Sequence, residues 1–395
     1  MNVRRMSLLL FVLLTFVSVR AEETSGSISA VLQPYVDSGA LAGAVTAVVT
    51  RDKVHPIERV GYADITSKTP MKADTLFWIA SMSKPLTGAA LMMLVDEGKI
   101  SLDDPLEKYL PEFKNVSYIA ESNKEQSILK KNTKTITIRD CMAHISGLPF
   151  LARIEQKIDT YTLRESVIAY AMAPLIAEPH TKYLYSNCGI KTGGRIIEVV
   201  SGMPYEEFME TRLFKPLGMK DTTLWPSEEQ ESRLAKSYKP SADKTKLEEI
   251  QIQYLTYPLT NRKRGACPGG GYFSTAGDLA LFAQMILNGG TLNGKKYLSE
   301  AAIKQMTSNQ TGALDAGPTA TNAVPKGSYG IGWSVGGNGY GHGGAYSTDL
   351  WIHADKGVAT IWMVQHAGYG GKDGGKILPA FKKAALELVA KEKKQ

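Results

Sequence analysis

The chain has few cysteines, and their arrangement argues against several kinds of site. Only three occur among 395 residues, at Cys141, Cys188 and Cys267. Three thiols can form at most one intramolecular disulfide, and their spacing matches none of the usual zinc-binding patterns. We therefore expect free, partly buried thiols, and we assign no metal and no cofactor.

Long apolar runs are also scarce, and no stretch beyond the N-terminus is apolar enough to cross a membrane, which needs about 20 apolar residues. The single apolar run covers residues 8–19, follows Arg4 and Arg5, and ends at Val19-Arg20-Ala21. A basic start, a short apolar segment and a small-residue cleavage site are typical of a secretory signal peptide. We predict that residues 1–21 are removed and that the mature protein is periplasmic or secreted, with no stable membrane span. An uncleaved membrane anchor is the alternative.

A strongly basic surface of the kind that binds nucleic acid is missing as well. The net charge is +7, and Arg4, Arg5 and Arg20 supply three of these charges, which leaves +4 on the mature chain. The lysine clusters at 124–134 and 391–394 have no aromatic residues among them, so we interpret them as solvated surface. We expect a small-molecule substrate and no nucleic-acid partner.

The predicted elements run from strands to helices and back to strands. Residues 41–65 alternate around Arg51-Asp52-Lys53, which indicates a β-hairpin, and residues 81–97 have helical spacing before Gly98. Helical periods fill the middle of the chain, for example at 195–200 and 278–287. Strands are predicted again at 329–335, 349–354 and 358–365, followed by an amphipathic helix that begins near Ile377.

This order predicts an α+β fold, in which an antiparallel β-sheet is flanked by N- and C-terminal helices and contains a large, mostly helical inserted domain. The predicted division is a signal peptide at 1–21, the first part of an α/β domain at 22–99, a helical domain at 100–324, and the second part of the α/β domain at 325–395.

Ser81-Met82-Ser83-Lys84 is the first candidate for catalysis. Residues three apart share a helix face, so the Ser81 hydroxyl and the Lys84 amine can meet, and a partly desolvated lysine can act as a base for a serine nucleophile. The same Ser-x-x-Lys pattern occurs at Ser127 and Ser241 in polar surroundings, whereas only the copy at Ser81 follows an apolar approach and opens an amphipathic helix. An ordinary helix N-terminus is the alternative interpretation.

Two further motifs contain groups that suit the same chemistry. In Tyr185-Ser186-Asn187, a tyrosinate beside a lysine ammonium would be a credible general base, and the Asn187 amide could bond both Lys84 and a substrate. In His342-Gly343-Gly344, the glycines would allow close approach of the backbone to a ligand, and the histidine could bond a substrate or carry a proton. The alternatives are a core tyrosine beside a capping asparagine and a glycine-rich hairpin with an incidental histidine.

Together the three motifs resemble the Ser-x-x-Lys, Ser-Asp-Asn and Lys-Thr-Gly set of serine β-lactamases and penicillin-binding proteins. The chain is similar to the class C-like branch of that superfamily, which includes class C β-lactamases, D-Ala-D-Ala carboxypeptidases, D-aminopeptidases and family VIII carboxylesterases. Other stretches share the resemblance: Phe77-Trp78-Ile79-Ala80, Leu94 to Lys99, His144-Ile145-Ser146-Gly147-Leu148, Pro216-Leu217-Gly218-Met219 and Ser274 to Leu279.

The resemblance implies a β-lactamase/transpeptidase-like fold and an acyl-enzyme on Ser81. It assigns proton exchange to Lys84 and Tyr185 and substrate binding to Asn187, His342, Gly343 and Gly344. The oxyanion hole would be formed by the backbone N–H groups of Ser81 and Ala345.

Two other motifs are rejected, and two positions depart from the family pattern. Lys191-Thr192-Gly193 lies only six residues after Tyr185, in a predicted helix, and Gly332-Trp333-Ser334-Val335-Gly336 is followed by glycines where a nucleophile elbow requires a helix. His342 stands where many β-lactamases have lysine, and His180 stands where the family often has glycine; for His180 we have no functional account.

The leading hypothesis from the sequence is a serine hydrolase that acts as a carboxylesterase on small esters, because a histidine at 342 offers no permanent cation for the carboxylate of a β-lactam. The alternatives are a D-Ala-D-Ala carboxypeptidase, D-amino-acid peptidase or β-lactamase, and a non-catalytic penicillin-binding protein.

Overall fold

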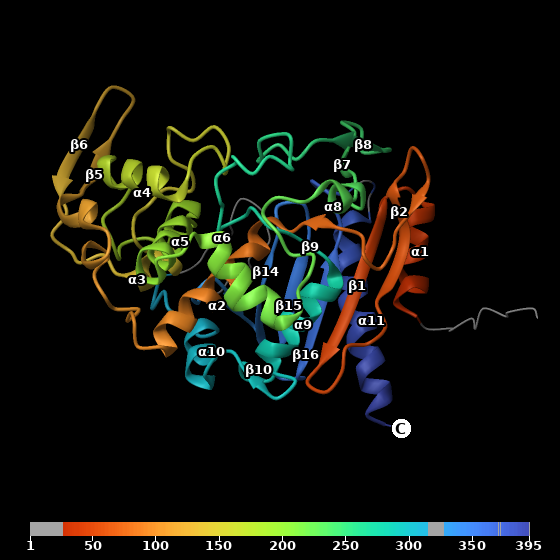
Figure 1. Ribbon diagram of the computed structural model, residues 1–395. Helices are drawn as coiled ribbons and strands as arrows, with labels where there is room; N and C mark the ends of the chain where they lie inside the picture. Colours follow the sequence, from red (N-terminus) through yellow and green to blue (C-terminus); the bar gives the residue numbers. More distant parts are fainter. Residues whose placement is uncertain (1–26, 315–327, 370, 372, 395) are drawn as a thin grey trace, which may run out of the picture.

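The computed structural model describes residues 27–314, 328–369, 371 and 373–394. Its centre is an eight-stranded antiparallel sheet (Figure 1) with the strand order β12-β13-β14-β15-β16-β1-β2-β3. The central pair joins the two ends of the sequence, since Val45 of β1 lies opposite Met363 of β16. The strands are β1 Gly43–Thr50, β2 Glu58–Asp64, β3 Thr69–Pro70, β12 Ser328–Tyr329, β13 Ser334–Gly336, β14 Gly339–Gly343, β15 Asp349–His353 and β16 Val358–Met363.

Both faces of the central strands are covered, and the alternation of side chains divides the core in two. Val45, Ala47 and Val49 of β1 belong to the larger core cluster, whereas Ala44 and Val48 belong to a smaller one on the other face. Every residue of β1 and of β16 is buried, as expected for a strand in a sheet that is packed on both sides.

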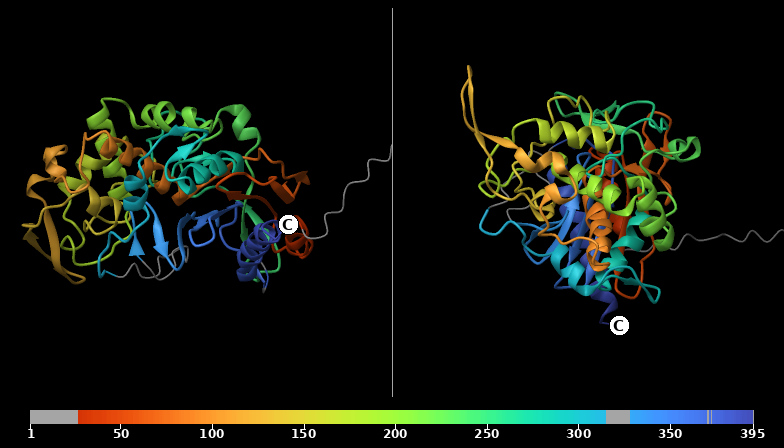
Figure 2. Two further views of the ribbon diagram at one scale, coloured as in Figure 1. Left: turned by 90° about the horizontal axis from the view of Figure 1, so that it is seen from below. Right: turned by 60° about the vertical axis from the view of Figure 1, so that its left-hand side comes forward.

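The two terminal helices cover the smaller core. Helix α1 (Ile28–Asp37) and helix α11 (Ile377–Glu392) lie against one another and against the sheet (Figures 1 and 2). Phe381 of α11 packs on Trp362 of β16. On the opposite face, α9 (Ala276–Leu287) contacts β1 and β16. The predicted flanking of the sheet by N- and C-terminal helices is confirmed.

Between β3 and β12, most of the regular secondary structure of the described residues is helical, which confirms the predicted α+β fold. The helices of this middle section are α2 Ser83–Asp96, α3 Ile138–Met142, α4 Leu163–Met172, α5 Asn187–Ser201, α6 Tyr205–Phe208, α7 Lys215–Leu217, α8 Glu228–Ser232, α9 and α10 Glu300–Met306. The helical periods predicted at 195–200 and 278–287 lie in α5 and α9. No helix of the described residues is long and apolar enough to cross a membrane.

The helical section also contains small two-stranded sheets. The pair β5 (Ser117–Ser122) and β6 (Ser127–Lys131) projects from the body of the molecule (Figure 2), and every residue of β6 is exposed. The pair β4 (Phe77–Trp78) and β9 (Phe273–Ser274) is buried instead and leads directly into the turn that holds Ser81. The remaining pairs are β7 Ser237–Pro240 with β8 Leu247–Ile250, and β10 Thr291–Leu292 with β11 Lys295–Lys296.

One predicted strand is wrong as a continuous element. The stretch 329–335 is divided into β12 and β13 by a turn in which the Gly330 N–H donates to Trp333 O and the Ile331 N–H donates to Met306 O. Gly332 has φ +80°, a backbone conformation that residues with a side chain rarely adopt. It also lies so close to the backbone of Lys84 that a Cβ atom would be 2.5 Å from Lys84 O. The turn therefore fits the chain against the start of α2.

The cysteine prediction is partly corrected, and the predicted domain limits stay predictions. Cys141, Cys188 and Cys267 are all free, as expected, but they are fully rather than partly buried. The predicted signal peptide at 1–21 and the limit at 324 lie outside the described residues. The sheet strands come from 43–70 and 328–363, which is compatible with the division at 99/100.

Candidate active site

Ser81 lies in a single 3₁₀ turn, Ala80–Met82, between the buried strand β4 and helix α2. Ala80 has φ +45°, an unusual backbone conformation for a residue with a side chain, and its carbonyl accepts a 2.6 Å hydrogen bond from the Ser83 hydroxyl. Ser81 is partly accessible, whereas the residues around it in the turn are buried. The strained turn thus presents one hydroxyl to the outside at the start of a helix.

Lys84 is completely buried in the first turn of α2, directly behind this hydroxyl. Its Nζ lies 3.1 Å from Ser81 Oγ and donates to Asn187 Oδ1 at 2.8 Å and to the carbonyl of Gly269 at 2.6 Å. No carboxylate of the described residues forms an ion pair with it. Because burial disfavours the ammonium form, the pKa of Lys84 is lowered from 10.5 to about 7. Near neutral pH, Lys84 is therefore able to take up a proton.

Tyr185 and Asn187 reach the same place from the N-terminus of α5. Ser186 caps this helix by accepting the Gly189 N–H at 2.8 Å, which fixes Asn187 in its first turn. The Tyr185 ring lies with its centroid 4.7 Å from Lys84 Nζ. The structure thus brings together the hydroxyl, amine, phenol and amide that the sequence proposed, from positions up to 106 residues apart.

The protonation state of this group differs from the sequence-based interpretation. We expected the lysine cation to lower the pKa of Tyr185, but burial raises it above 10.0, and the contact with Ser81 only partly opposes this effect. The pKa of the lysine falls instead. The arrangement therefore favours a neutral phenol beside an amine that titrates near neutrality.

His342 is buried at the end of β14 with both ring nitrogens engaged. Nδ1 lies 2.6 Å from Gly343 O, so it is the protonated nitrogen, and Nε2 accepts from the Tyr329 hydroxyl at 2.9 Å. The Tyr185 hydroxyl lies 3.4 Å from the same Nε2. Burial, with the nearby Lys84 as a smaller cause, lowers the pKa of His342 from 6.5 to about 3. From the sequence we expected only that this histidine is not a permanent cation, and the structure gives a neutral imidazole.

Gly344 allows the end of β14 to approach the Ser81 turn. A Cβ atom at this position would lie 2.6 Å from Ile79 O and 2.1 Å from Thr348 Oγ1, so only glycine fits. The next residue, Ala345, is partly accessible, and its N–H donates no hydrogen bond to any described residue. Ser81 opens a helix, where N–H groups lack intrahelical acceptors. These two N–H groups are compatible with the predicted oxyanion hole.

Gly269 is a part of the site that the sequence analysis missed. Its carbonyl accepts the shortest of the three hydrogen bonds of Lys84 Nζ. A Cβ atom at Gly269 would lie 2.8 Å from Asn187 Oδ1. The signal was the run of three glycines at 269–271 after Pro268, since glycines allow the backbone to approach other groups closely.

Comparison with known proteins agrees with this geometry. The model of the Beta-lactamase family matches residues 28–380. The chain belongs to this family, and it is a serine hydrolase. It is 32% identical over 283 residues to Protein Rv1367c of Mycobacterium tuberculosis, with 69% of each chain covered. It is 26% identical over 288 residues to a putative D-alanyl-D-alanine carboxypeptidase of Salmonella agona, covering 67% of this chain and 60% of that protein's length.

A solved structure shares the fold. EstCE1, a hydrolase with promiscuous acyltransferase activity, superposes with a TM-score of 0.72 at 20% identity, covering 91% of this chain and 97% of that one. The β-lactamase/transpeptidase-like fold implied by the motifs is thereby confirmed.

The two rejected motifs lie where the sequence analysis expected them. Lys191 is buried inside α5 and forms an ion pair with Glu155, so it cannot line the cleft as a family Lys-Thr-Gly lysine would. Ser334 is buried in β13, where it pairs with Gly341, and no nucleophile elbow is present there. His180 has φ +64°, which explains why glycine suits this position, and its Nε2 lies 2.8 Å from Asp140 Oδ2.

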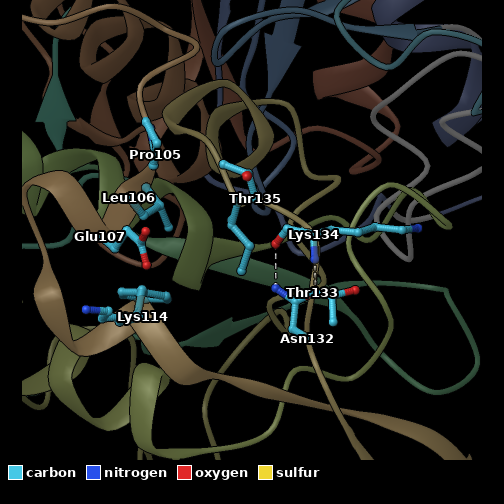
Figure 3. Close-up of a pocket in the computed structure, with 10 residues that line it drawn as sticks. Pro105, Leu106, Glu107, Lys114, Asn132, Thr133, Lys134 and Thr135 are labelled. Carbon is cyan, nitrogen blue, oxygen red and sulfur yellow. Dashed lines mark hydrogen bonds between the residues drawn. The ribbon is translucent and has the colours of Figure 1, made fainter.

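A hollow elsewhere on the described surface is separate from the site. It has a volume of about 200 Å³ and lies between residues 105–114 and 132–136, where Asn132 and Lys134 bond to each other (Figure 3). It includes none of the candidate site residues. Within the described ranges, no group of three or more His, Cys, Asp or Glu side chains is placed to hold a metal ion.

Proposed function

We propose that this chain is a carboxylesterase that hydrolyses small esters through an acyl-enzyme on Ser81. The observation that carries the proposal is the environment of His342, which is buried, bonded on both nitrogens and has a pKa lowered to about 3. It therefore offers no positive charge at neutral pH for the carboxylate of a β-lactam. An ester needs no such cation.

The surface beside the nucleophile supports an apolar substrate. Phe150 is 44% exposed, and its ring stacks on Tyr185 with the ring centroids 6.1 Å apart. A substrate carbonyl placed at Ser81 would bring its acyl or alkoxy group next to this aromatic face. Burial of apolar surface there would contribute about 25 cal/mol per Å².

In the acylation step, the neutral amine of Lys84 accepts the Ser81 hydroxyl proton over the 3.1 Å contact while Oγ attacks the ester carbonyl carbon. The carbonyl oxygen becomes an oxyanion that the N–H groups of Ser81 and Ala345 stabilise. Losing one donor of this kind typically costs about 2.7–4 kcal/mol. When the tetrahedral intermediate collapses, the departing alkoxide takes the proton from Lys84 through the Tyr185 hydroxyl and leaves as an alcohol.

Deacylation repeats these steps with water as the nucleophile. Water loses a proton to the same amine and attacks the acyl carbon, and Ser81 Oγ leaves as the protonated hydroxyl while the acid is released. Asn187 keeps its Oδ1 on Lys84 Nζ at 2.8 Å, so its amide N–H groups are the part directed to the substrate.

A peptidase acting on D-amino-acid substrates, or a β-lactamase, is the second candidate. The likeness to a putative D-alanyl-D-alanine carboxypeptidase supports it, and the same Ser81, Lys84 and Tyr185 arrangement would cleave an amide. The third candidate is a penicillin-binding protein without turnover. The base at Lys84 argues against it, because a protein that only binds penicillin has no need of a base.

The test exposes the purified mature chain to a fluorophosphonate, a penicillin, a short-chain nitrophenyl ester and a D-Ala-D-Ala peptide, following intact mass and turnover. We expect ester turnover that Ser81→Ala abolishes and that Ser127→Ala preserves. Ser127 is a matched control because it opens another Ser-x-x-Lys sequence on an exposed strand. Peptide or penicillin turnover without ester turnover would support the second candidate, and a penicillin complex with no turnover of any substrate would support the third.

We also infer that the protein is exported, because residues 1–21 have the layout of a signal peptide. Expression of the full chain with fractionation and N-terminal sequencing tests this. A mature form beginning after Ala21 outside the cytoplasm is expected, and an uncleaved chain retained in the membrane fraction would contradict it.

A further inference from the structure

His144 holds the segment that contains Tyr185 on both sides of the tyrosine. Its carbonyl accepts the Leu184 N–H at 2.8 Å, and its ring nitrogen Nδ1 accepts the Ser186 N–H at 3.1 Å. One residue thereby fixes the backbone on both sides of Tyr185, at Leu184 and at Ser186. Because Nδ1 is an acceptor, the imidazole is neutral with its proton on Nε2.

The imidazole ring also lies against the phenol that it brackets. The ring centroids of His144 and Tyr185 are 4.6 Å apart, and those of His144 and Tyr329 are 4.4 Å apart. Tyr329 in turn donates its hydroxyl to His342. His144 therefore supports the Tyr185 ring from behind, while the hydroxyl of Tyr185 faces the site.

Two features of His144 are unfavourable for folding. The residue has φ +65°, a conformation that glycine or asparagine adopts more easily, and its Nε2 is buried with no hydrogen-bond partner among the described residues. A buried unpaired donor is unfavourable, because it has lost its hydrogen bonds to water without gaining a partner in the protein. Stability alone does not account for a histidine at this position, whereas a need to fix Tyr185 does.

We propose that His144 is a positioning residue for Tyr185 and that it acts through the two hydrogen bonds around the tyrosine without touching the substrate. This inference rests on the proposed function, in which the Tyr185 hydroxyl relays the proton between Lys84 and the leaving group. Displacement of a catalytic group by about 1 Å can lower a rate by about 10²-fold.

The test compares His144→Asn with His144→Leu. Asparagine and leucine have the same branched shape, but only asparagine retains an acceptor where Nδ1 stands, and it tolerates positive φ. We expect His144→Asn to retain kcat within about threefold and His144→Leu to lose about 10–100-fold, with KM changed less than about threefold in both. Thermal unfolding of each variant shows whether it is folded.

Equal losses of kcat in the two folded variants would overturn the proposal, as would a loss that appears in KM alone. If His144→Leu does not fold, His144→Ala replaces it, and if neither folds, a loss of more than tenfold in His144→Asn is the overturning result. His180→Asn is the control, because His180 also has positive φ on the adjoining segment but bonds Asp140 instead. It should leave kcat unchanged.

The rate at which Ser81 is labelled by a fluorophosphonate is measured for the same variants. This readout separates the two proposals. Fluoride leaves without the proton that Tyr185 relays, so the labelling rate of His144→Leu should stay near that of the unaltered protein. Absence of ester turnover in the unaltered protein would refute the esterase function, whereas a loss of labelling in His144→Leu as large as its loss of kcat would refute the positioning role.

Discussion

Lys84 and Lys191 are two fully buried lysines on the contacting helices α2 and α5, and they differ in what surrounds the amine. Lys191 forms an ion pair with Glu155, whose oxygens also accept hydrogen bonds from Ser166, Tyr170 and the Ala152 N–H. The hydrogen-bond partners of Lys84 among the described residues are only a hydroxyl, an amide and a backbone carbonyl, and burial lowers its pKa to about 7. One is therefore part of a structural ion pair, and the other is suited to be a base.

The comparison shows that burial and residue type do not decide the role of a lysine in this fold. A carboxylate compensates the desolvation of one amine, while neutral acceptors leave the other uncompensated. The local sequence does not show this distinction. Lys191-Thr192-Gly193 matches a catalytic motif of the family, and yet its lysine belongs to the structural ion pair.

Replacing the base should have the largest effect. Lys84→Met removes the proton acceptor of Ser81, so we expect kcat/KM for a nitrophenyl ester to fall about 10²–10⁴-fold, the usual contribution of general base catalysis. The protein should stay folded, because no buried charge is left unpaired. Steady-state kinetics and thermal unfolding measure the two effects, and a Lys84→Met variant with near-native kcat/KM would contradict the account.

Replacing the structural lysine should act on stability instead. Lys191→Met leaves the Glu155 carboxylate buried without its cation, and we expect the free energy of unfolding to fall by about 3–5 kcal/mol. The activity per folded molecule should change little. Adding Glu155→Gln removes the unpaired charge and should restore part of the stability in denaturant titrations; no restoration would mean that the ion pair is not the cause.

Giving Lys84 a carboxylate should make it resemble Lys191. Asn187→Asp places an acidic group where an amide oxygen lies 2.8 Å from Nζ. An opposite charge at this distance favours the ammonium, so the pKa of Lys84 should rise by about 1–3 units and the rising limb of the pH–rate profile should move upward by the same amount. The midpoint of the limb is the readout, because the loss of the Asn187 amide lowers the amplitude for other reasons. An unchanged midpoint would contradict the prediction.

The buried histidines should give the smallest effect. Burial lowers the pKa of His342 to about 3 and that of His366 to about 4, below the 6.5 of an unfolded chain. The unfolded state therefore binds more protons below pH 6.5, so the free energy of unfolding should fall as the pH is lowered from 6.5 toward 4, by about 1 kcal/mol per pH unit for each group. Denaturant titrations at pH 6.5 and 5.5 measure this, and His366→Gln should reduce the slope.

Much of the fold could be predicted because its signals are local. The hairpin around Arg51-Asp52-Lys53, the helix before Gly98 and the terminal helix at Ile377 are found as β1 with β2, α2 and α11. The division of 329–335 could not be predicted, because it depends on a hydrogen bond to the carbonyl of Met306 in α10. Only folding brings that carbonyl next to Ile331.

The site was predictable in its members but not in its electrostatics. Ser81, Lys84, Tyr185 and Asn187 were found by motif, and the structure brings them together. Which of Lys84 and Tyr185 titrates near neutrality depends on burial and on partners such as Gly269 O, and no local pattern shows that this carbonyl meets Lys84. His144 was noticed only as a family landmark for the same reason, since its bonds to residues 184 and 186 exist only after folding.

The pH dependence of Ser81 acylation in the unaltered protein tests the central claim most directly. Pre-steady-state release of nitrophenol from a short-chain ester, followed from pH 5 to pH 10.5, reports the proton acceptor of the hydroxyl. We expect the acylation rate to rise with a midpoint near pH 7, the lowered pKa of Lys84, and then to stay level. A midpoint near pH 10, as for an ordinary lysine or tyrosine, would contradict the account.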